Sequence, residues 1–198
     1  MGWRYNQNVI ADITPERGLD MSTAKSGRRP SPRLCHTGGE PAIATTSGNN
    51  STPDITEVYL CEVFVPATCL VTGIAVFNGS DVTGSLKVGL FDSAGTLLRA
   101  SAAAGTAGSG TDAYQLIPFA LNGANVAATT IELPGPATYY VGVTYSSATA
   151  RYNTHAVGTF GAGKVTSTVF ATAFSTTTLT VTPPTTFTAN LGNIASLY

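Results

Sequence analysis

The chain has 198 residues, of which 11% are charged, and its formal net charge at pH 7 is -1. Globular proteins average about 25% charged residues, so uncharged side chains dominate this surface. The balance argues against a free-standing nucleic-acid-binding protein, because neutralising phosphates requires a surplus of Lys and Arg. No run approaches the ~18 apolar residues of a membrane span, so no membrane association is expected.

Residues 1–53 are predicted to form a long extended N-terminal arm. They hold six of the ten Lys and Arg, and residues 22–53 are rich in Gly, Pro, Ser, Thr and Asn without helical or strand periodicity. Such a segment cannot bury enough apolar surface to offset its ordering entropy. We therefore expect it to order only against a partner, although the apolar start could also pack on its own domain. The candidate partner contacts are aromatic or basic: Trp3, Tyr5, Arg28, Arg29 and Arg33.

Residues 54–198 are predicted to form one β domain of about ten short strands with turn residues between them and no helical pattern. This pattern is typical of an antiparallel β-sandwich or jelly roll. The predicted strands are 55–65, 69–78, 85–92, 96–102, 114–121, 129–133, 138–146, 156–160, 164–174 and 178–182.

Alternation predicts which strand faces are buried. The strand 55–65 carries apolar side chains on both faces, so both faces are expected to be covered. In the strand 85–92, the leucines and the valine are predicted to point inward and Phe91 outward. The C-terminal residues 191–198 are apolar and are expected to close a sheet edge or, alternatively, to meet a symmetry mate.

Three cysteines do not make a disulfide framework, which favours synthesis in a reducing cytoplasm. The first residues also lack the apolar segment of a signal peptide. Cys61 and Cys69 lie on either side of a turn at Pro66, where they could approach each other across a hairpin. We expect them to be buried free thiols, with a late disulfide as the alternative.

The sequence offers no arrangement that indicates catalysis. The two histidines, His36 and His155, lack a nucleophile motif. Residues 158–164 match the start of a phosphate-binding loop, but Val165 stands where Ser or Thr would bind Mg²⁺, and a strand pattern follows. We expect a protein that is not an enzyme and that needs no metal or cofactor. The remaining candidates for a metal site, all in predicted turns, are Asp81, Asp92 and Asp112.

Tyrosines supply the candidate ligand-binding aromatics: Tyr139, Tyr145 and Tyr152. They could form a sugar-stacking platform, but alternation places Tyr139 and Tyr140 on opposite faces of one strand. Use in the core or in a protein interface is the favoured interpretation.

The segment from residue 57 to residue 145 resembles the jelly-roll head decoration (cement) proteins of tailed bacteriophages. The similarity rests on the strand pairs YLCEVFVPATCLVTGIAVFNG and GSLKVGLFDSAGTLLRASA, followed by PGPATYYVGVTY. It implies a non-enzymatic virion structural protein, made in the host cytoplasm, that binds the major capsid protein on the capsid surface. It also implies a homo-oligomer, with a trimer favoured, and no direct contact with nucleic acid. The alternative is a phage fibre or a carbohydrate-binding module that recognises host surface glycans.

Overall fold

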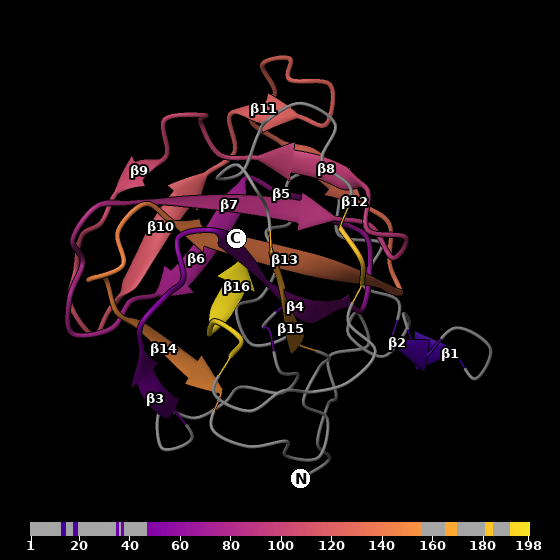
Figure 1. Ribbon diagram of the computed structural model, residues 1–198. Helices are drawn as coiled ribbons and strands as arrows, with labels where there is room; N and C mark the ends of the chain where they lie inside the picture. The colour runs from indigo at the N-terminus through magenta and orange to yellow at the C-terminus, as the bar shows by residue number, and fades with distance from the viewer. Residues whose placement is uncertain are drawn as a thin grey trace, which may run out of the picture.

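The computed structural model describes residues 13–14, 18–19, 35, 37, 47–155, 165–169, 181–183 and 191–198 (Figure 1). Within these residues the fold is all-β without a helix, and every ladder is antiparallel, which confirms the predicted β-sandwich class. In chain order the strands are β1 (Ile13–Thr14), β2 (Gly18–Leu19), β3 (Ser47–Ser51), β4 (Glu57–Val65), β5 (Cys69–Val71), β6 (Gly73–Phe77), β7 (Ser85–Phe91), β8 (Leu97–Ala100), β9 (Thr106–Ala107), β10 (Tyr114–Pro118), β11 (Leu121–Asn122), β12 (Ile131–Leu133), β13 (Ala137–Tyr145), β14 (Tyr152–His155), β15 (Val165–Val169) and β16 (Ala195–Leu197).

The larger sheet has the strand order β11-β8-β7-β13-β4-β15, and β9 also pairs with β7. Strand β13 lies in its interior, where Val141 pairs with Cys61 of β4 on one side and with Leu90 of β7 on the other. β7 and β13 run alongside each other in Figure 1. Aromatic and β-branched residues are common in β13, as expected for a strand enclosed by neighbours.

A second layer packs against the larger sheet. It contains a three-stranded sheet of order β10-β6-β16 and the two-stranded pair β12-β5. The core between the layers takes the inward face of each long strand, as alternation predicted for Leu86, Val88 and Leu90. The C-terminal strand β16 closes one end of the β10-β6-β16 sheet, as expected for residues 191–198.

A second apolar cluster covers the other face of the larger sheet, so β4 is buried on both faces as its sequence indicated. Phe91 belongs to this cluster. Its side chain lies on the face opposite the main core, as predicted, but it is fully buried there and not exposed to solvent. The ring fits because residue 142 is glycine: a Cβ there would lie 2.8 Å from Phe91 Cε2 and 3.0 Å from Val58 Cγ1. Val181 joins the cluster from a distant part of the chain, and its amide donates a 2.8 Å hydrogen bond to the Gly95 carbonyl.

Several predicted strands differ in their bounds. The segment 69–78 is interrupted at Thr72 and contributes β5 and β6, which pair with different partners. The segment between the predicted strands 96–102 and 114–121 contains the short strand β9, and β14 was not predicted. Residues 181–182 are not in a strand, and 156–160 lie outside the described residues.

Parts of the predicted arm belong to the sandwich. Strand β3 pairs with β14. Thr37 is fully buried, forms a bridge with Val63 of β4, and donates its amide to the Ala195 carbonyl of β16 at 2.9 Å. Thr37 therefore forms a bridge with the larger sheet and hydrogen-bonds to the β10-β6-β16 sheet, although it lies in the segment expected to be the arm. The pair β1-β2 makes no ladder with any other strand of the described part.

The second cluster predicts a contrast between two phenylalanines. Phe91→Ala removes a fully buried ring and should lower the free energy of unfolding by about 3–5 kcal/mol. Phe64 of β4 lies on the same face of the larger sheet but is 49% exposed, so Phe64→Ala should cost less than about 1 kcal/mol. Urea unfolding of the two variants makes the comparison; equal losses would contradict a packed second cluster.

Candidate interaction surface

The residues proposed from sequence fall into two groups. Trp3, Tyr5 and the three arm arginines 28, 29 and 33 lie outside the described residues. Tyr139, Tyr145 and Tyr152 are respectively 7%, 2% and 1% exposed and lie in the core between the layers. Their burial agrees with the core interpretation and leaves no tyrosine platform for a sugar at these positions.

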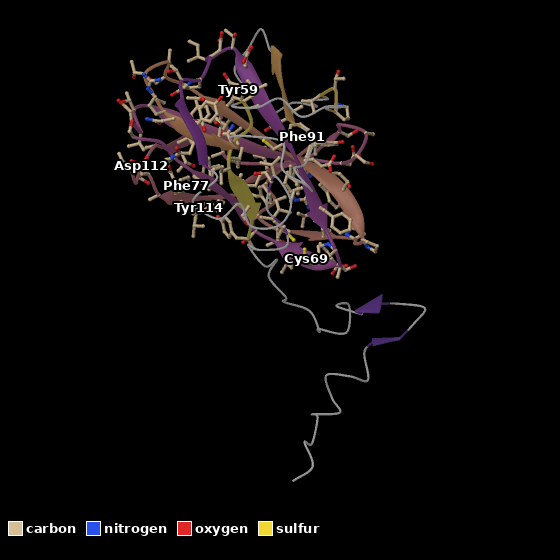
Figure 2. All side chains as sticks on the ribbon, turned by 90° about the horizontal axis from the view of Figure 1, so that it is seen from below. Tyr59, Cys69, Phe77, Phe91, Asp112 and Tyr114 are labelled. Atoms are coloured by element: carbon tan, nitrogen blue, oxygen red, sulfur yellow. The ribbon has the colours of Figure 1, made fainter. Side chains whose placement is uncertain are left out.

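Two of these tyrosines form an aromatic cluster with Tyr59 of β4, which Figure 2 labels. The ring centroid of Tyr152 lies 5.1 Å from that of Tyr59 and 5.2 Å from that of Tyr145. Each hydroxyl has a partner: Tyr145 donates to Asn193 Oδ1, Tyr152 donates to the Leu191 carbonyl at 3.1 Å, and Tyr59 accepts from the Asp54 amide at 2.7 Å. The cluster therefore ties the C-terminal segment to the larger sheet.

Burial holds these phenols in their neutral form. It raises the pKa of Tyr59 from 10.0 to about 12, because a phenolate would lose its hydration in the core. Burial also raises the pKa values of Tyr145 and Tyr152 well above the ordinary value.

The disulfide between Cys61 and Cys69 that the sequence left as an alternative is not formed. All three, including Cys35, are free and buried, which confirms the thiol state expected for Cys61 and Cys69. Cys61 donates to the Asn193 carbonyl at 3.5 Å, and burial raises its pKa to about 12. Because β4 and β5 lie in different sheets, the turn connects two layers instead of closing a hairpin.

Asp81 and Asp92 form turns within their own segments, whereas Asp112 Oδ1 accepts from Asn153 Nδ2 at 3.4 Å. Asp92 Oδ1 accepts from the amides of Ala94 and Thr96 at 2.9 and 2.8 Å. Hydrogen bonds from the hydroxyl and amide of Thr83 lower the pKa of Asp81. Across the part of the chain that the structure describes, no three His, Cys, Asp or Glu residues gather as a metal site would require. The carboxylates of Asp81 and Asp92 thus have the turn role that Asp commonly takes.

An exposed apolar stripe lies along β10. Tyr114 and Leu116 are 49% and 60% exposed, Pro118 is also exposed, and the alternate residues Gln115 and Ile117 point into the protein. Tyr114 and Leu116 pair directly with Phe77 and Ala75 of β6, so these side chains share the outer face of the three-stranded sheet. β10 is an edge strand of that sheet as described.

The outer face carries aromatic side chains but no charge. The ring centroids of Tyr114 and Phe77 are 5.0 Å apart, and Figure 2 shows the two residues labelled side by side at the rim of the sandwich. The strands β6, β10 and β16 contain no Asp, Glu, Lys or Arg. We call this face, formed by Phe77, Tyr114, Leu116 and Pro118, the β10 face.

A buried polar network fixes the β10 face against the neighbouring loop. Asn78 Nδ2 donates to Gln115 Oε1 at 2.9 Å and to the Ser109 carbonyl at 2.8 Å. Gln115 Nε2 in turn donates to the Ala107 carbonyl at 2.7 Å. Because Gln115 lies between Tyr114 and Leu116 on the strand, the network sets the position of both exposed side chains.

Sequence reasoning placed a strand here but did not identify the β10 face. The signal was present in the alternation Tyr114-Gln-Leu116-Ile-Pro118, which puts large apolar residues on one face and a polar residue on the other. By itself, that alternation predicts that the apolar face is buried. In the structure Gln115 is buried and hydrogen-bonded, and Leu116 is exposed.

The tyrosine cluster predicts loss of stability at alkaline pH. A phenol whose folded pKa is raised contributes stability that is complete below its unfolded pKa of 10 and lost as the pH rises towards the folded value near 12. The free energy of unfolding should fall across this window by up to about 1.4 kcal/mol per pH unit for each such group. Urea titrations at several pH values measure it, and Tyr59→Phe should reduce the slope. Ionisation of all eight tyrosines near pH 10 in the folded chain, seen as tyrosinate absorbance, would contradict it.

Comparisons with protein-family models, with curated proteins and with solved structures found no match to this chain. The search of the described residues for a helix long and apolar enough to cross a membrane found none. The β10 face is therefore interpreted from its own geometry and chemistry.

Proposed function

We propose that the protein is a non-enzymatic virion structural protein, a decoration or cement protein that binds the outer surface of a capsid shell. In this proposal the β10 face contacts the major capsid protein or a neighbouring copy, and the N-terminal arm adds contacts to adjacent subunits. Many weak contacts across a closed shell give a strong attachment through multivalency.

The uncharged β10 face is the observation that carries the proposal. The centres of protein–protein interfaces are depleted in charged residues and enriched in aromatic ones. The β10 face has both properties, with Phe77 and Tyr114 in ring contact and Leu116 the most exposed large apolar residue of the described part. Its position on an edge strand also suits a flat contact with another protein, or the addition of a strand to the sheet.

The chemistry of the surroundings favours a protein partner. The described basic residues are Lys87, Arg99 and Arg151, and none of them lies in the three-stranded sheet. Arg99 donates to the carbonyls of Thr130 and Leu98, so its guanidinium is engaged within the domain. The alternative of a glycan-binding module loses support because its three candidate tyrosines are buried.

Capsid binding should depend on the β10 face. The full chain should co-sediment saturably with expanded, undecorated capsids of the phage that encodes it, at a fixed ratio to the capsid subunit. Leu116→Ser should weaken this binding by about tenfold or more, as expected for an apolar residue at the centre of an interface. Val126→Ser is the matched control, because Val126 is 58% exposed and lies outside the β10 face. Absence of pelleting by the full chain, or equal binding by both variants, would contradict the proposal.

The arm makes a separate prediction. A deletion of residues 1–33 removes all five candidate arm contacts but keeps Cys35, Thr37 and β3. It should leave the thermal midpoint within a few degrees of the full chain and weaken capsid binding. A deletion of residues 1–53 also removes the contacts of Thr37 with Asn193 and Ala195, and should lower the thermal midpoint clearly. Full capsid affinity after the shorter deletion would show that the arm does not contribute.

A further inference from the structure

The hydrogen bonds of the β10-β6 ladder determine which residues of β10 direct their backbone groups away from β6, because bonded and non-bonded residue pairs alternate along an antiparallel ladder. At one end of β10, the Asn78 amide donates to the Ala113 carbonyl at 3.0 Å. At the other end, the Phe119 amide donates to the Thr72 carbonyl at 2.9 Å. Both pairs continue the register of the ladder, so the odd-numbered residues of β10 bond to β6. Leu116 therefore directs its amide and its carbonyl to the outer edge of the sheet.

The outer edge of β10 is open to a further strand at Leu116. β10 is the last strand of its sheet as described, and Leu116 is 60% exposed. Within the described residues, the Leu116 amide and carbonyl have no hydrogen-bond partner. Backbone groups at such an edge can bind an added strand. Pro118 has no amide hydrogen and ends the run of donors, so the added strand is expected to be short.

The absence of charge at this edge favours a second copy of the chain as the partner. In a contact with twofold symmetry, the residue at the axis meets the same residue of the other copy. Like charges directly opposite each other destabilise a strand pair. β10 has no charged side chain, so it can lie antiparallel to itself without repulsion. The net charge of -1 for the whole chain adds little repulsion between copies.

We propose that the edge of β10 binds the β10 edge of a second copy, in antiparallel orientation about a twofold axis at Leu116. The Leu116 amide of each copy donates to the Leu116 carbonyl of the other, and Tyr114 of each copy lies opposite Pro118 of the other. The two β10-β6-β16 sheets then form one continuous sheet, with both β10 faces on the same side. This inference names a partner of the β10 face, and it rests on the proposed function only where that proposal includes a neighbouring copy.

The side chains of the β10 face suit this register. Leu116, the most exposed large apolar residue of the described part, meets its own copy at the centre of the contact. The Tyr114 ring, which already packs on Phe77 at a centroid distance of 5.0 Å, gains the Pro118 ring of the other copy as an apolar neighbour. A contact between two short strands is small for a stable dimer, so the dimer should be weak in solution. On a shell that holds copies close together, the same contact becomes effective.

The first test uses the unaltered full chain without capsids. Sedimentation equilibrium over a range of chain concentrations should show a reversible equilibrium between monomer and dimer. Hydrogen exchange measured by NMR should show that the Leu116 amide exchanges more slowly as the dimer forms, because the amide then donates to the other copy. A chain that stays monomeric at the highest concentration, that assembles as a trimer, or that dimerises without protecting the Leu116 amide would overturn the proposal.

A pair of charge variants tests the register. Leu116→Lys and Leu116→Asp each place like charges at the twofold axis, so each alone should dimerise about tenfold or more weakly than the unaltered chain. A mixture of the two should form a heterodimer, because opposite charges then meet at the axis. Val126→Lys is the control, since Val126 is 58% exposed and lies outside β10, and it should dimerise normally. Unchanged dimerisation of the single variants, or no heterodimer in the mixture, would show that Leu116 does not meet its own copy; if a variant does not fold, the Leu116 amide of the unaltered chain still decides.

Capsid binding is measured separately, so that the two proposals can fail independently. Dimers that do not pellet with capsids would contradict the proposed function and leave the β10 dimer standing. Chains that pellet with capsids through Leu116 but stay monomeric in solution, with an unprotected Leu116 amide, would overturn the β10 dimer and leave the proposed function standing.

Discussion

Burial of the strand β13 on both faces is the constraint on which the rest of this structure depends. A strand inside a sheet can exclude water from both sides only if each face meets a complete apolar layer. On one face Val141, Val143 and Tyr145 meet the second sheet. On the other, Gly142 leaves the space into which the Phe91 ring packs, and Val181 adds cover from far along the chain. Tyr140 completes this second cluster from the same strand.

The same need for cover on both faces explains why Thr37, from the predicted N-terminal arm, is part of the fold. Val63 of β4 pairs with Tyr139 of β13 and also forms a bridge with Thr37. Thr37 also hydrogen-bonds to Ala195 of β16, so one residue connects the larger sheet with the β10-β6-β16 sheet.

The low charge of the chain has different consequences inside and outside. In the interior, the buried hydrogen bonds are made by uncharged amides and hydroxyls such as those of Asn78, Gln115 and Thr37, each with a specific partner. Outside, it leaves the β10-β6-β16 sheet without a charged side chain, and apolar groups on its edge strand β10 remain in water. An exposed apolar surface of this kind is a common mark of association, and it links the composition to the proposed role on a protein shell.

Period-two alternation and turn residues in the sequence determined the all-β class, most strands from 57 to 145, and the opposite faces of Tyr139 and Tyr140, because these depend on neighbours along the chain. The tertiary structure alone decided which strand faces are covered. It buried Phe91, which local alternation left outside, and exposed Leu116, because burial depends on packing between distant segments. It also placed Cys61 and Cys69 in different sheets, since the turn at Pro66 crosses between layers. A sequence pattern records the faces of each strand, but only the assembled layers determine what each face meets.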